Sequence, residues 1–411
     1  MKRLVLVVVC LVLAAGCVVA KEVPAPAVPP VEAPAPAPPP APAAQETAVR
    51  FPGRLAYART GELLILDGAT GREIRVGSGT GPAWSHDGQW LAYGQERVHM
   101  IRPDGTGLVT FEDLPPAKWF KWSPGDAVLA VGTFGSGTWA VRPTGTVNGL
   151  VFDPHGFQTL AWSHDGTQVA CTTSDIRANP LPIDIIWIAP VEGGSQTNVL
   201  KDEQNGLYLV DWWPNGQGLF YWVAIAHAVS ASMDGLPLMS MPLGGGAPRK
   251  LTTMLANDRW ISWAPDRQRF LATVGGGRTL WFGKSLAICD TQACEPIPQP
   301  EGVVSLDGVW SPDGGQIAFV RAEAREFMAS GEGWLETRTL WVAKPDGSGA
   351  RQLMNAGTGV VSPAWVSPTQ LLYAAGGGLW LIDTEGGAPV KVASVDIPTL
   401  SRLDIPYAWH K

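Results

Sequence analysis

Residue types that commonly perform chemistry are sparse in this chain and match no known catalytic pattern. Its 411 residues include 6 histidines and 5 cysteines, with no Gly-x-Ser-x-Gly elbow, P-loop, His-Glu-x-x-His or EF-hand pattern. His86 and His164 stand at equivalent positions of two similar turns, which indicates a turn role. His227 could belong to a site, although the sequence shows no partner for it. We therefore expect no metal and no cofactor, and a catalytic site would consist of scattered residues.

Charged and aromatic residues gather instead in three long connecting segments, at 174–184, 224–236 and 321–338. Insertions on one face of a repeat protein commonly mark its binding face. The first half of the third segment is rich in Ala, Glu and Arg and is expected to form a short helix, and its Trp334 is expected to be exposed in a recognition patch. The alternative is a solvated flap held by weak internal ion pairs. The predicted ligand-binding residues are Arg177, Asp184, His227, Asp234, Arg325, Glu326, Glu332 and Trp334.

Two cysteines are close enough in sequence to pair. Cys289 and Cys294 flank a predicted turn between neighbouring strands. Cross-strand positions beside a turn suit disulfide geometry, and an exported protein meets an oxidising compartment. We expect a Cys289–Cys294 disulfide, with two free thiols as the alternative, and a gain of two hydrogens in mass on reduction distinguishes them. Cys171 lies in a predicted strand and is expected to be a small core residue.

A repeat that recurs along the chain must position these segments. In its most regular copy, Trp310 is followed by Ser311-Pro312-Asp313-Gly314, where Pro, Asp and Gly favour a tight turn. An apolar strand, Ile317-Ala318-Phe319, comes next. The tryptophans that begin the copies are Trp84, Trp122, Trp162, Trp213, Trp263, Trp310 and Trp365, and Trp409 forms a half-copy near the C-terminus.

A period of roughly 40–50 residues with four short strands in each repeat is typical of a β-propeller. We predict an all-β fold of four-stranded antiparallel blades, eight by the count of expected strands, with seven as the alternative if 207–251 is not a full blade. The first repeat lacks a tryptophan-containing strand before Leu55, and the segment from Ile405 to Trp409 can supply one. We expect this C-terminal strand to pair into the first blade and close the ring, which removes two open sheet edges.

The repeat resembles that of TolB-like propellers, which are relatives of the WD repeat in bacterial envelope proteins. The copy that begins at Trp310 matches the family pattern fully, whereas the copies at Trp213, Trp263 and Trp365 are degraded. The resemblance covers nearly all of residues 52–411. It implies the fold more strongly than the function, because the same repeat serves scaffolds, binding modules and propellers attached to enzymes.

The N-terminus has the composition of a bacterial export signal. Basic residues precede an apolar run at 4–13, and small residues precede Cys17 in a pattern that resembles a lipobox. The resemblance implies a signal peptide at 1–16 and lipid attachment to Cys17 in a lipidated N-terminus at 17–21. A Pro/Ala-rich linker at 22–50 is expected to be extended, and the propeller follows at 51–411. The alternative is an ordinary secretory signal that leaves a soluble protein.

The net charge of −7 argues against binding of nucleic acid. We predict a monomeric, lipid-anchored extracytoplasmic propeller, in the periplasm or on the cell surface, that serves as a binding or scaffold module for an envelope protein, peptide or glycan. The alternative is a hydrolase or lyase with its active site at the channel mouth. A cluster of His, Glu and Arg around the axis would favour the enzyme, and an axis lined by backbone and apolar side chains would favour the binding module.

Overall fold

The protein is described by a computed structural model, in which contacts divide the chain into two units, Met1–Glu46 and Thr47–Lys411. The first unit contains the expected signal peptide, Cys17 and most of the linker, and it lies outside the described residues. A helix with the length and hydrophobicity of a bilayer span is absent from the residues described. Those residues are 50–79, 81–94, 96–125, 127–133, 137–151, 159–175, 178, 181–225, 235–396 and 407–411.

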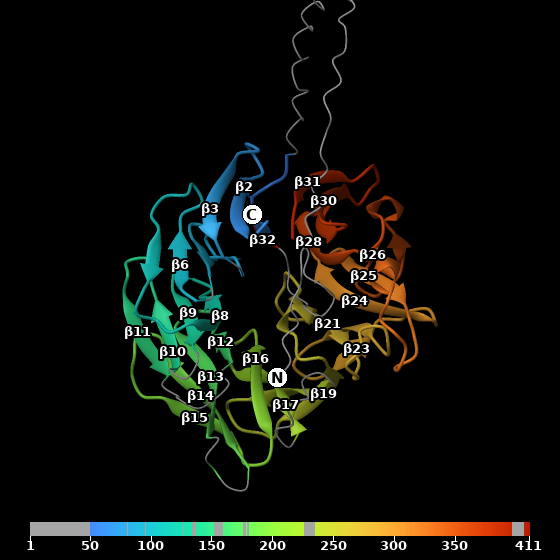
Figure 1. The fold of residues 1–411 in the computed structure, drawn as a ribbon. Coiled ribbons are helices and arrows are strands. Elements are labelled where there is room, and N and C mark those ends of the chain that lie inside the picture. Colours follow the sequence, from blue (N-terminus) through green and yellow to red (C-terminus); the bar gives the residue numbers. More distant parts are fainter. Residues whose placement is uncertain are drawn as a thin grey trace, which may run out of the picture. The chain divides into compact units, whose positions relative to one another are not determined.

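Eight four-stranded antiparallel sheets form the blades of a ring (Figure 1). In blades 2 to 8 the strands pair in chain order, whereas blade 1 takes its first strand from the C-terminus. The predicted all-β, eight-bladed propeller is therefore confirmed. The seven-bladed alternative is wrong, because the irregular stretch at 207–251 forms the strands of blade 5.

The strand bounds of the eight blades are as follows. Blade 1 consists of β32 (Tyr407–His410), β1 (Arg54–Arg59), β2 (Glu62–Asp67) and β3 (Glu73–Ser78). Blade 2 has β4 (Ala83–Trp84), β5 (Leu91–Tyr93), β6 (Val98–Ile101) and β7 (Val109–Phe111), and blade 3 has β8 (Ala117–Trp122), β9 (Leu129–Thr133), β10 (Gly137–Val141) and β11 (Val147–Val151). Blade 4 has β12 (Leu160–Trp162), β13 (Gln168–Asp175), β14 (Ile183–Pro190) and β15 (Thr197–Asp202), and blade 5 has β16 (Gly206–Trp212), β17 (Gly218–Ala224), β18 (Leu236–Pro242) and β19 (Arg249–Met254). Blade 6 has β20 (Ile261–Trp263), β21 (Phe270–Val274), β22 (Ser285–Cys289) and β23 (Cys294–Pro296). Blade 7 has β24 (Val303–Trp310), β25 (Ile317–Glu323), β26 (Thr339–Ala343) and β27 (Arg351–Gln352), and blade 8 has β28 (Val361–Ser367), β29 (Gln370–Ala375), β30 (Gly378–Asp383) and β31 (Val390–Ser394). Short 3-10 turns lie at η2 (Asp258–Trp260), η3 (Leu335–Thr337) and η4 (Met354–Ala356).

The repeat motif makes the turn between the first and second strands of a blade. In blade 7 the N–H of Gly314 donates to the carbonyl oxygen of Ser311 at 2.9 Å, and Ser311 Oγ donates to Asp313 Oδ1 at 2.6 Å. Gly314 has a φ of 73°, a conformation that favours a residue without Cβ. Equivalent bonds follow Trp84 and Trp162. The turn chemistry therefore fixes the hairpin in the same way in several blades.

The motif tryptophans join successive blades. The indole N–H of Trp122 donates to the carbonyl oxygen of Ala83 at 2.8 Å, and that of Trp162 donates to Lys121 at 3.0 Å. Each acceptor directly precedes the motif tryptophan of the preceding blade. Trp84, Trp212 and Trp365 repeat the pattern, with the carbonyl oxygens of Ala408, Ala161 and Val309 as acceptors.

Trp212, rather than Trp213, is thus the motif residue of blade 5. The side chain of Trp212 is 2% exposed, and its indole makes the inter-blade bond. Trp213 occupies the position of the motif serine, because its N–H donates to the carbonyl oxygen of Gly218 at 2.8 Å across the turn. The prediction that this copy begins at Trp213 is wrong by one residue. Trp212 precedes Gly216 by four positions, as Trp84 precedes Gly88, so the spacing of the repeat agrees with the inter-blade bond.

β32 closes the ring as predicted. It pairs antiparallel with β1, with Trp409 opposite Leu55 and Tyr407 opposite Tyr57. The hydroxyl of Tyr407 donates to the carbonyl oxygen of Ser362 in blade 8, and its ring belongs to the apolar cluster between blades 8 and 1. One short strand therefore bonds the last blade to the first.

Candidate functional site

A cavity of about 540 Å³ lies among the first strands of blades 2 to 6 and the turns that follow them. Sites for small molecules commonly span roughly 300–1,000 Å³. Its aromatic lining consists of Trp84, Phe120, Trp122, Trp162 and Trp263. The ionisable side chains in its wall are His86, Lys121, His164, Asp211 and Arg267. Aromatic and mainly basic groups from five consecutive blades thus face one space.

The tryptophans of this wall are held by their own N–H groups. Trp84, Trp122 and Trp162 donate to main-chain carbonyls of the preceding blades, and Trp263 donates to Asp211 Oδ2 at 2.8 Å. Because these donors are already satisfied, the rings can offer a ligand mainly stacking and apolar contact. The wall is therefore largely preformed.

Asp211 replaces a main-chain acceptor between blades 5 and 6. A β-bulge shifts the pairing of β16 between Leu209 and Asp211, and the Asp211 carboxylate takes the indole N–H of Trp263 that a carbonyl accepts elsewhere. Its other oxygen accepts the N–H of Trp212 at 2.8 Å. Burial raises the pKa of Asp211, although these two hydrogen bonds and the charge of Lys121 oppose the rise. Asp211 thus anchors Trp263 while it places a carboxylate in the wall.

Arg267 reaches the cavity from an unusual backbone position. It follows Asp266 in the motif turn of blade 6, where sister turns carry glycine, and its φ is 53°. Its Nη1 lies 3.2 Å from Nδ1 of His164, which belongs to blade 4. The guanidinium can only donate, so Nδ1 must accept. This contact spans the cavity from one blade to another two places along the ring.

Asp184, which the sequence predicted to lie on the ligand-binding face, is buried between two blades. The residue is 7% exposed, and its Oδ2 accepts the N–H of Leu207 at 2.7 Å. This bond ties β14 of blade 4 to β16 of blade 5. The carboxylate is used to satisfy a buried main-chain donor, which costs free energy if left without a partner.

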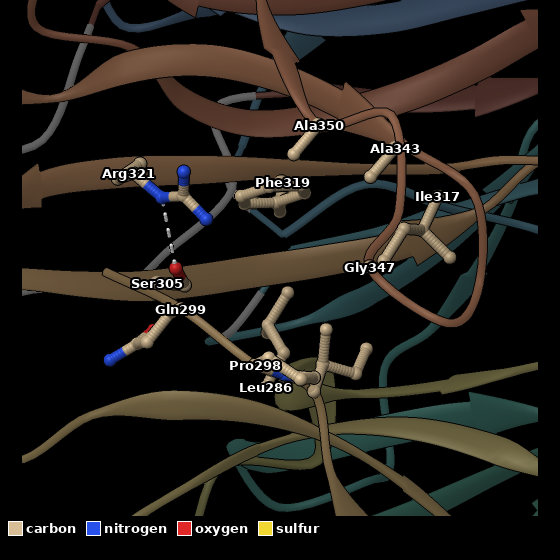
Figure 2. Close-up of a pocket in the computed structure, with 11 residues that line it drawn as sticks. Leu286, Pro298, Gln299, Ser305, Ile317, Phe319, Arg321, Ala343, Gly347 and Ala350 are labelled. Atoms are coloured by element: carbon tan, nitrogen blue, oxygen red, sulfur yellow. Dashed lines mark hydrogen bonds between the residues drawn. The ribbon is translucent and has the colours of Figure 1, made fainter.

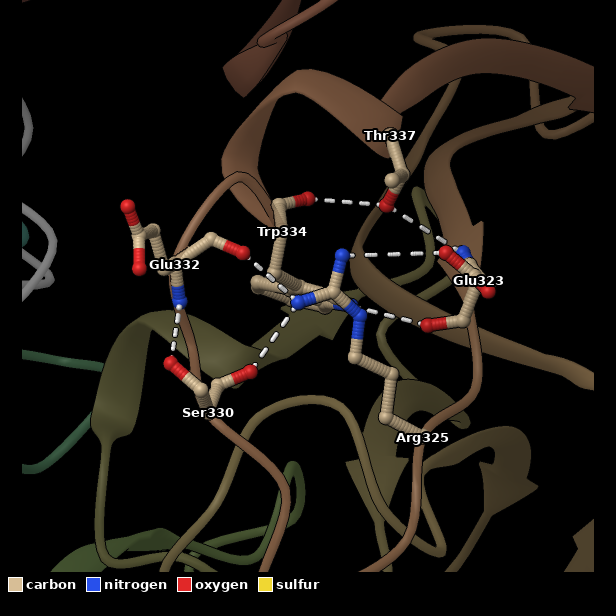
Figure 3. Close-up of polar contacts among 6 residues, drawn as sticks. All are labelled: Glu323, Arg325, Ser330, Glu332, Trp334 and Thr337. Atoms are coloured by element: carbon tan, nitrogen blue, oxygen red, sulfur yellow. Dashed lines mark hydrogen bonds and ion pairs between the residues drawn. The ribbon is translucent and has the colours of Figure 1, made fainter.

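Trp334 was expected to be exposed, and this expectation is wrong. Its side chain is 0% exposed, and its indole N–H donates to the carbonyl oxygen of Glu323 at 2.8 Å (Figure 3). Its ring centroid lies 5.9 Å from that of Trp281. The guanidinium carbon of Arg338 lies 5.8 Å from the same Trp334 ring centroid. Trp334 is therefore the core of its own segment, because a large ring is stabilised more by burial than by exposure.

The segment at 324–338 is held in place by side-chain bonds to its main chain. Arg325 Nη1 donates to the carbonyl oxygens of Ser330 at 3.0 Å and Glu332 at 2.8 Å (Figure 3). The first half forms no helix, contrary to the prediction, and the single 3-10 turn η3 lies in the second half. The main-chain carbonyls of Ser330 and Glu332 thus accept hydrogen bonds from the Arg325 side chain rather than from helical N–H groups. The side chains of Glu326 and Glu332 are exposed.

Three of the predicted ligand-binding residues, Arg177, His227 and Asp234, lie outside the described residues. None of Asp184, Arg325, Glu326, Glu332 and Trp334 lines the cavity. The described part of the chain contains no group of three or more His, Cys, Asp or Glu residues that could hold a metal ion.

Cys289 and Cys294 end β22 and begin β23, where they stand opposite each other. Their Cα atoms are 4.0 Å apart and a disulfide joins their sulfurs. The oxidation state of the exported protein stays a prediction, which the mass before and after reduction tests. Cys171 is 0% exposed, and burial raises the pKa of its thiol to about 12, as for a core residue.

A second pocket, between blades 6 and 7, surrounds the buried side chain of Arg321 (Figure 2). The guanidinium carbon lies 4.3 Å from the Trp341 ring centroid and 5.1 Å from that of Phe319, and Nε lies 3.5 Å from Ser305 Oγ. Burial lowers the pKa of Arg321. The pocket has a volume of about 10 Å³, which is roughly the space that one water requires. It is therefore a packing feature rather than a ligand site.

Lys284 holds the connection between β21 and β22. It is 1% exposed, and its Nζ donates to the carbonyl oxygens of Gly276 at 2.8 Å, Gly277 at 2.9 Å and Phe282 at 3.1 Å. Burial lowers the pKa of Lys284 from its ordinary value of 10.5 to about 8. This ammonium therefore closes a loop whose Trp281 packs on Trp334.

The Lys284 pKa predicts a pH-dependent stability. Between pH 8 and 10.5 the unfolded chain keeps the Lys284 proton while the folded protein has lost it, so the free energy of unfolding rises with pH in this window. The full cost of the buried charge is present below pH 8. We expect the stability of wild type relative to Lys284→Met to increase from pH 7 to pH 10 in urea titrations. A flat difference, or one that falls with pH, would contradict the prediction.

The residues of the cavity were not predicted as a site from the sequence. Arg267 carried the clearest signal, because it stands where the turns after Trp84, Trp162 and Trp310 have glycine. Comparison of the repeat copies shows that a cationic residue replaces glycine at this position. Asp211 carried no comparable signal, because its role depends on a bulge that the sequence does not show.

Comparison with known proteins supports the fold and the repeat. No protein-family model matches the chain. Over 130 residues it is 29% identical to the Tol-Pal system protein TolB of Anaeromyxobacter dehalogenans (strain 2CP-C), a match that covers 31% of this chain and 26% of that protein. TolB from Acinetobacter baumannii is similar over 72% of this chain and 62% of its own, with 18% identity and a TM-score of 0.38. Dipeptidyl peptidase 4 of Porphyromonas gingivalis gives a TM-score of 0.57 at 8% identity, over 85% of this chain and 59% of its own.

The dipeptidyl peptidase likeness shows a shared fold and nothing of the chemistry, because the identity is so low. The similarity to TolB is one of sequence, at 29% identity over 130 residues. The chain is thus an eight-bladed β-propeller whose repeats are similar to those of TolB.

Proposed function

We infer that this protein is an envelope β-propeller that binds a protein partner through the cavity of blades 2 to 6. The cavity carries this proposal, because it gathers fixed aromatic rings and a few charged groups from five blades. Aromatic residues and arginine are the side chains that contribute most at protein interfaces. The partial similarity to a protein of the Tol-Pal system supports a partner in the bacterial envelope.

Export and lipid attachment at Cys17 belong to the same proposal. The N-terminal pattern supports an extracytoplasmic location, and the Pro/Ala-rich linker at 22–50 would let an anchored propeller reach away from the membrane. Labelled palmitate should enter the wild-type protein and not Cys17→Ser. Equal labelling of the two would contradict the anchor while leaving the binding function untouched.

The contacts of the ionisable groups favour binding over acid–base catalysis. Asp211 already accepts two hydrogen bonds from the wall, and His164 Nδ1 accepts from Arg267. Asp211 and His164 Nδ1 are thus engaged in holding Trp212, Trp263 and Arg267 in place. The lining also contains His86, and the fixed aromatic rings around these groups support binding as their main use.

A photo-crosslinking experiment tests the proposed binding site. The full-length protein would carry a photoreactive phenylalanine analogue at Phe120, which lines the cavity, or at Met328, which is 87% exposed outside it. Irradiation of cells that produce the two variants should give a discrete protein adduct at Phe120 and none at Met328. Adducts at Met328 alone would place partner binding on the loop face that the sequence suggested, and an absence of adducts at both would contradict protein binding.

A further inference from the structure

The backbone at Arg267 is held in a conformation that normally requires glycine. The motif turns of blades 2, 4, 5 and 7 have glycine at this position, with φ of 65° at Gly88, 71° at Gly166, 71° at Gly216 and 73° at Gly314. Arg267 adopts the same left-handed conformation with φ of 53°, although its Cβ makes that conformation unfavourable. Such local strain points to a use for the side chain.

The side chain of Arg267 enters the cavity without a carboxylate partner. Among the described residues, its polar contact is the 3.2 Å approach of Nη1 to His164 Nδ1, and it forms no ion pair with them. The side chain is exposed, and an imidazole acceptor does not neutralise the positive charge of the guanidinium. The remaining N–H donors of the planar guanidinium suit a carboxylate, which they can bind in a bidentate manner.

His164 holds Arg267 in place. Because Nδ1 accepts from Arg267, the imidazole proton lies on Nε2, which is buried and bonds to no described residue. The imidazole stands edge-on to the Trp263 ring, with centroids 6.4 Å apart. His164 therefore positions the Arg267 guanidinium beside an aromatic wall, and its own buried N–H is not accessible to a ligand.

The charge of the cavity contrasts with that of the whole protein. Lys121 and Arg267 are cationic and His86 and His164 are basic, whereas Asp211 is the single acidic residue of the described lining. The chain as a whole has a net charge of −7. Basic groups focused in a concave site attract anionic ligands even when the protein is acidic overall.

We propose that Arg267, held in place by His164, is a carboxylate receptor in the cavity, which binds an acidic side chain of the protein partner. This proposal rests on the proposed function and names the chemistry of the segment that the cavity accepts. Trp263 and its neighbours would stack on the residues beside the carboxylate. Lys121 would add to the attraction at longer range.

Titration of the full-length protein with capped pentaglutamate tests this receptor, with capped pentaglutamine as the neutral probe. Tryptophan fluorescence reports binding, because four tryptophans line the cavity. We expect a saturable change with pentaglutamate and binding that is about ten-fold weaker or more with pentaglutamine. Equal responses to both probes would overturn the proposal.

Arg267→Gly is the decisive variant, because it removes the cation and restores the residue of the sister turns. We expect its melting temperature to equal or exceed that of wild type and its affinity for pentaglutamate to fall about ten-fold or more. Arg269→Gln is the matched control, since Arg269 pairs with Asp266 at 3.3 Å outside the cavity lining, and its affinity should stay within about two-fold of wild type. An Arg267→Gly protein that binds as wild type would overturn the receptor.

The outcomes separate this receptor from the partner-binding function. Persistence of the Phe120 adduct in Arg267→Gly, together with no preference for pentaglutamate, would overturn the receptor and leave the proposed function intact. Arg267-dependent pentaglutamate binding without any adduct at Phe120 would support the receptor and contradict the protein partner.

Discussion

Replacement of Tyr407 by alanine is expected to lower the free energy of unfolding by about 3–5 kcal/mol, the usual cost of removing a large buried aromatic side chain. Tyr407 is 6% exposed and packs with Leu55 and Leu372 in the cluster between blades 8 and 1. Its strand supplies the first strand of blade 1, so a loose Tyr407 would also expose the edge of β1. The effect should therefore exceed that of a single core deletion elsewhere in a blade.

Tyr407→Phe separates packing from the hydroxyl bond to Ser362. It keeps the ring in the cluster and removes the hydroxyl, which donates to Ser362 and also lies 3.4 Å from the carbonyl oxygen of Leu372, so we expect a loss of about 1 kcal/mol. Urea unfolding followed by tryptophan fluorescence measures both variants. If Tyr407→Ala were as stable as Tyr407→Phe, the closing strand would contribute little to the stability of the ring, which would contradict the prediction.

The sequence was sufficient for the ring because closure depends on local patterns. The turn residues after Trp84, Trp162 and Trp310 determine the hydrogen bonds of their own turns. The first repeat lacks a strand before Leu55, and the C-terminal segment that contains Trp409 has the pattern of that strand. The prediction at Trp213 fails by one residue. Trp212 has the four-residue spacing to the turn glycine, Gly216, that other copies show, and its indole donates to a carbonyl of the preceding blade.

The candidate binding site was harder to predict from the sequence than the fold, because it depends on which side chains of different blades contact each other. The sequence predicted Trp334 to be exposed, because it stands in a long charged segment. In the structure the ring of Trp281, from the neighbouring loop, packs against Trp334 and helps to bury it. Arg267 and His164 are far apart in sequence and come together through ring geometry. A repeat pattern places each residue within its blade, but the contacts across the ring require coordinates.

The buried ion pair of Arg338 and Asp307 predicts the second large effect. Arg338 is 3% exposed and donates from Nη2 to Asp307 Oδ2, while Asp307 Oδ1 accepts the indole N–H of Trp260 at 2.9 Å. Removal of one partner from a buried pair leaves an uncompensated charge, which typically costs about 3–5 kcal/mol. We therefore expect Arg338→Met to lower the free energy of unfolding by this amount.

The double variant distinguishes a lost ion pair from lost packing around Trp334. Asp307→Asn keeps an acceptor for Trp260 and tolerates the φ of 52° at this position, so Arg338→Met with Asp307→Asn leaves no buried charge. Its stability should exceed that of Arg338→Met alone, because the uncompensated carboxylate is gone. If the double variant were instead less stable by the sum of the two single losses, the charges would not be coupled. The main role of Arg338 would then be its contact with the Trp334 ring, and the segment at 324–338 would depend on packing alone.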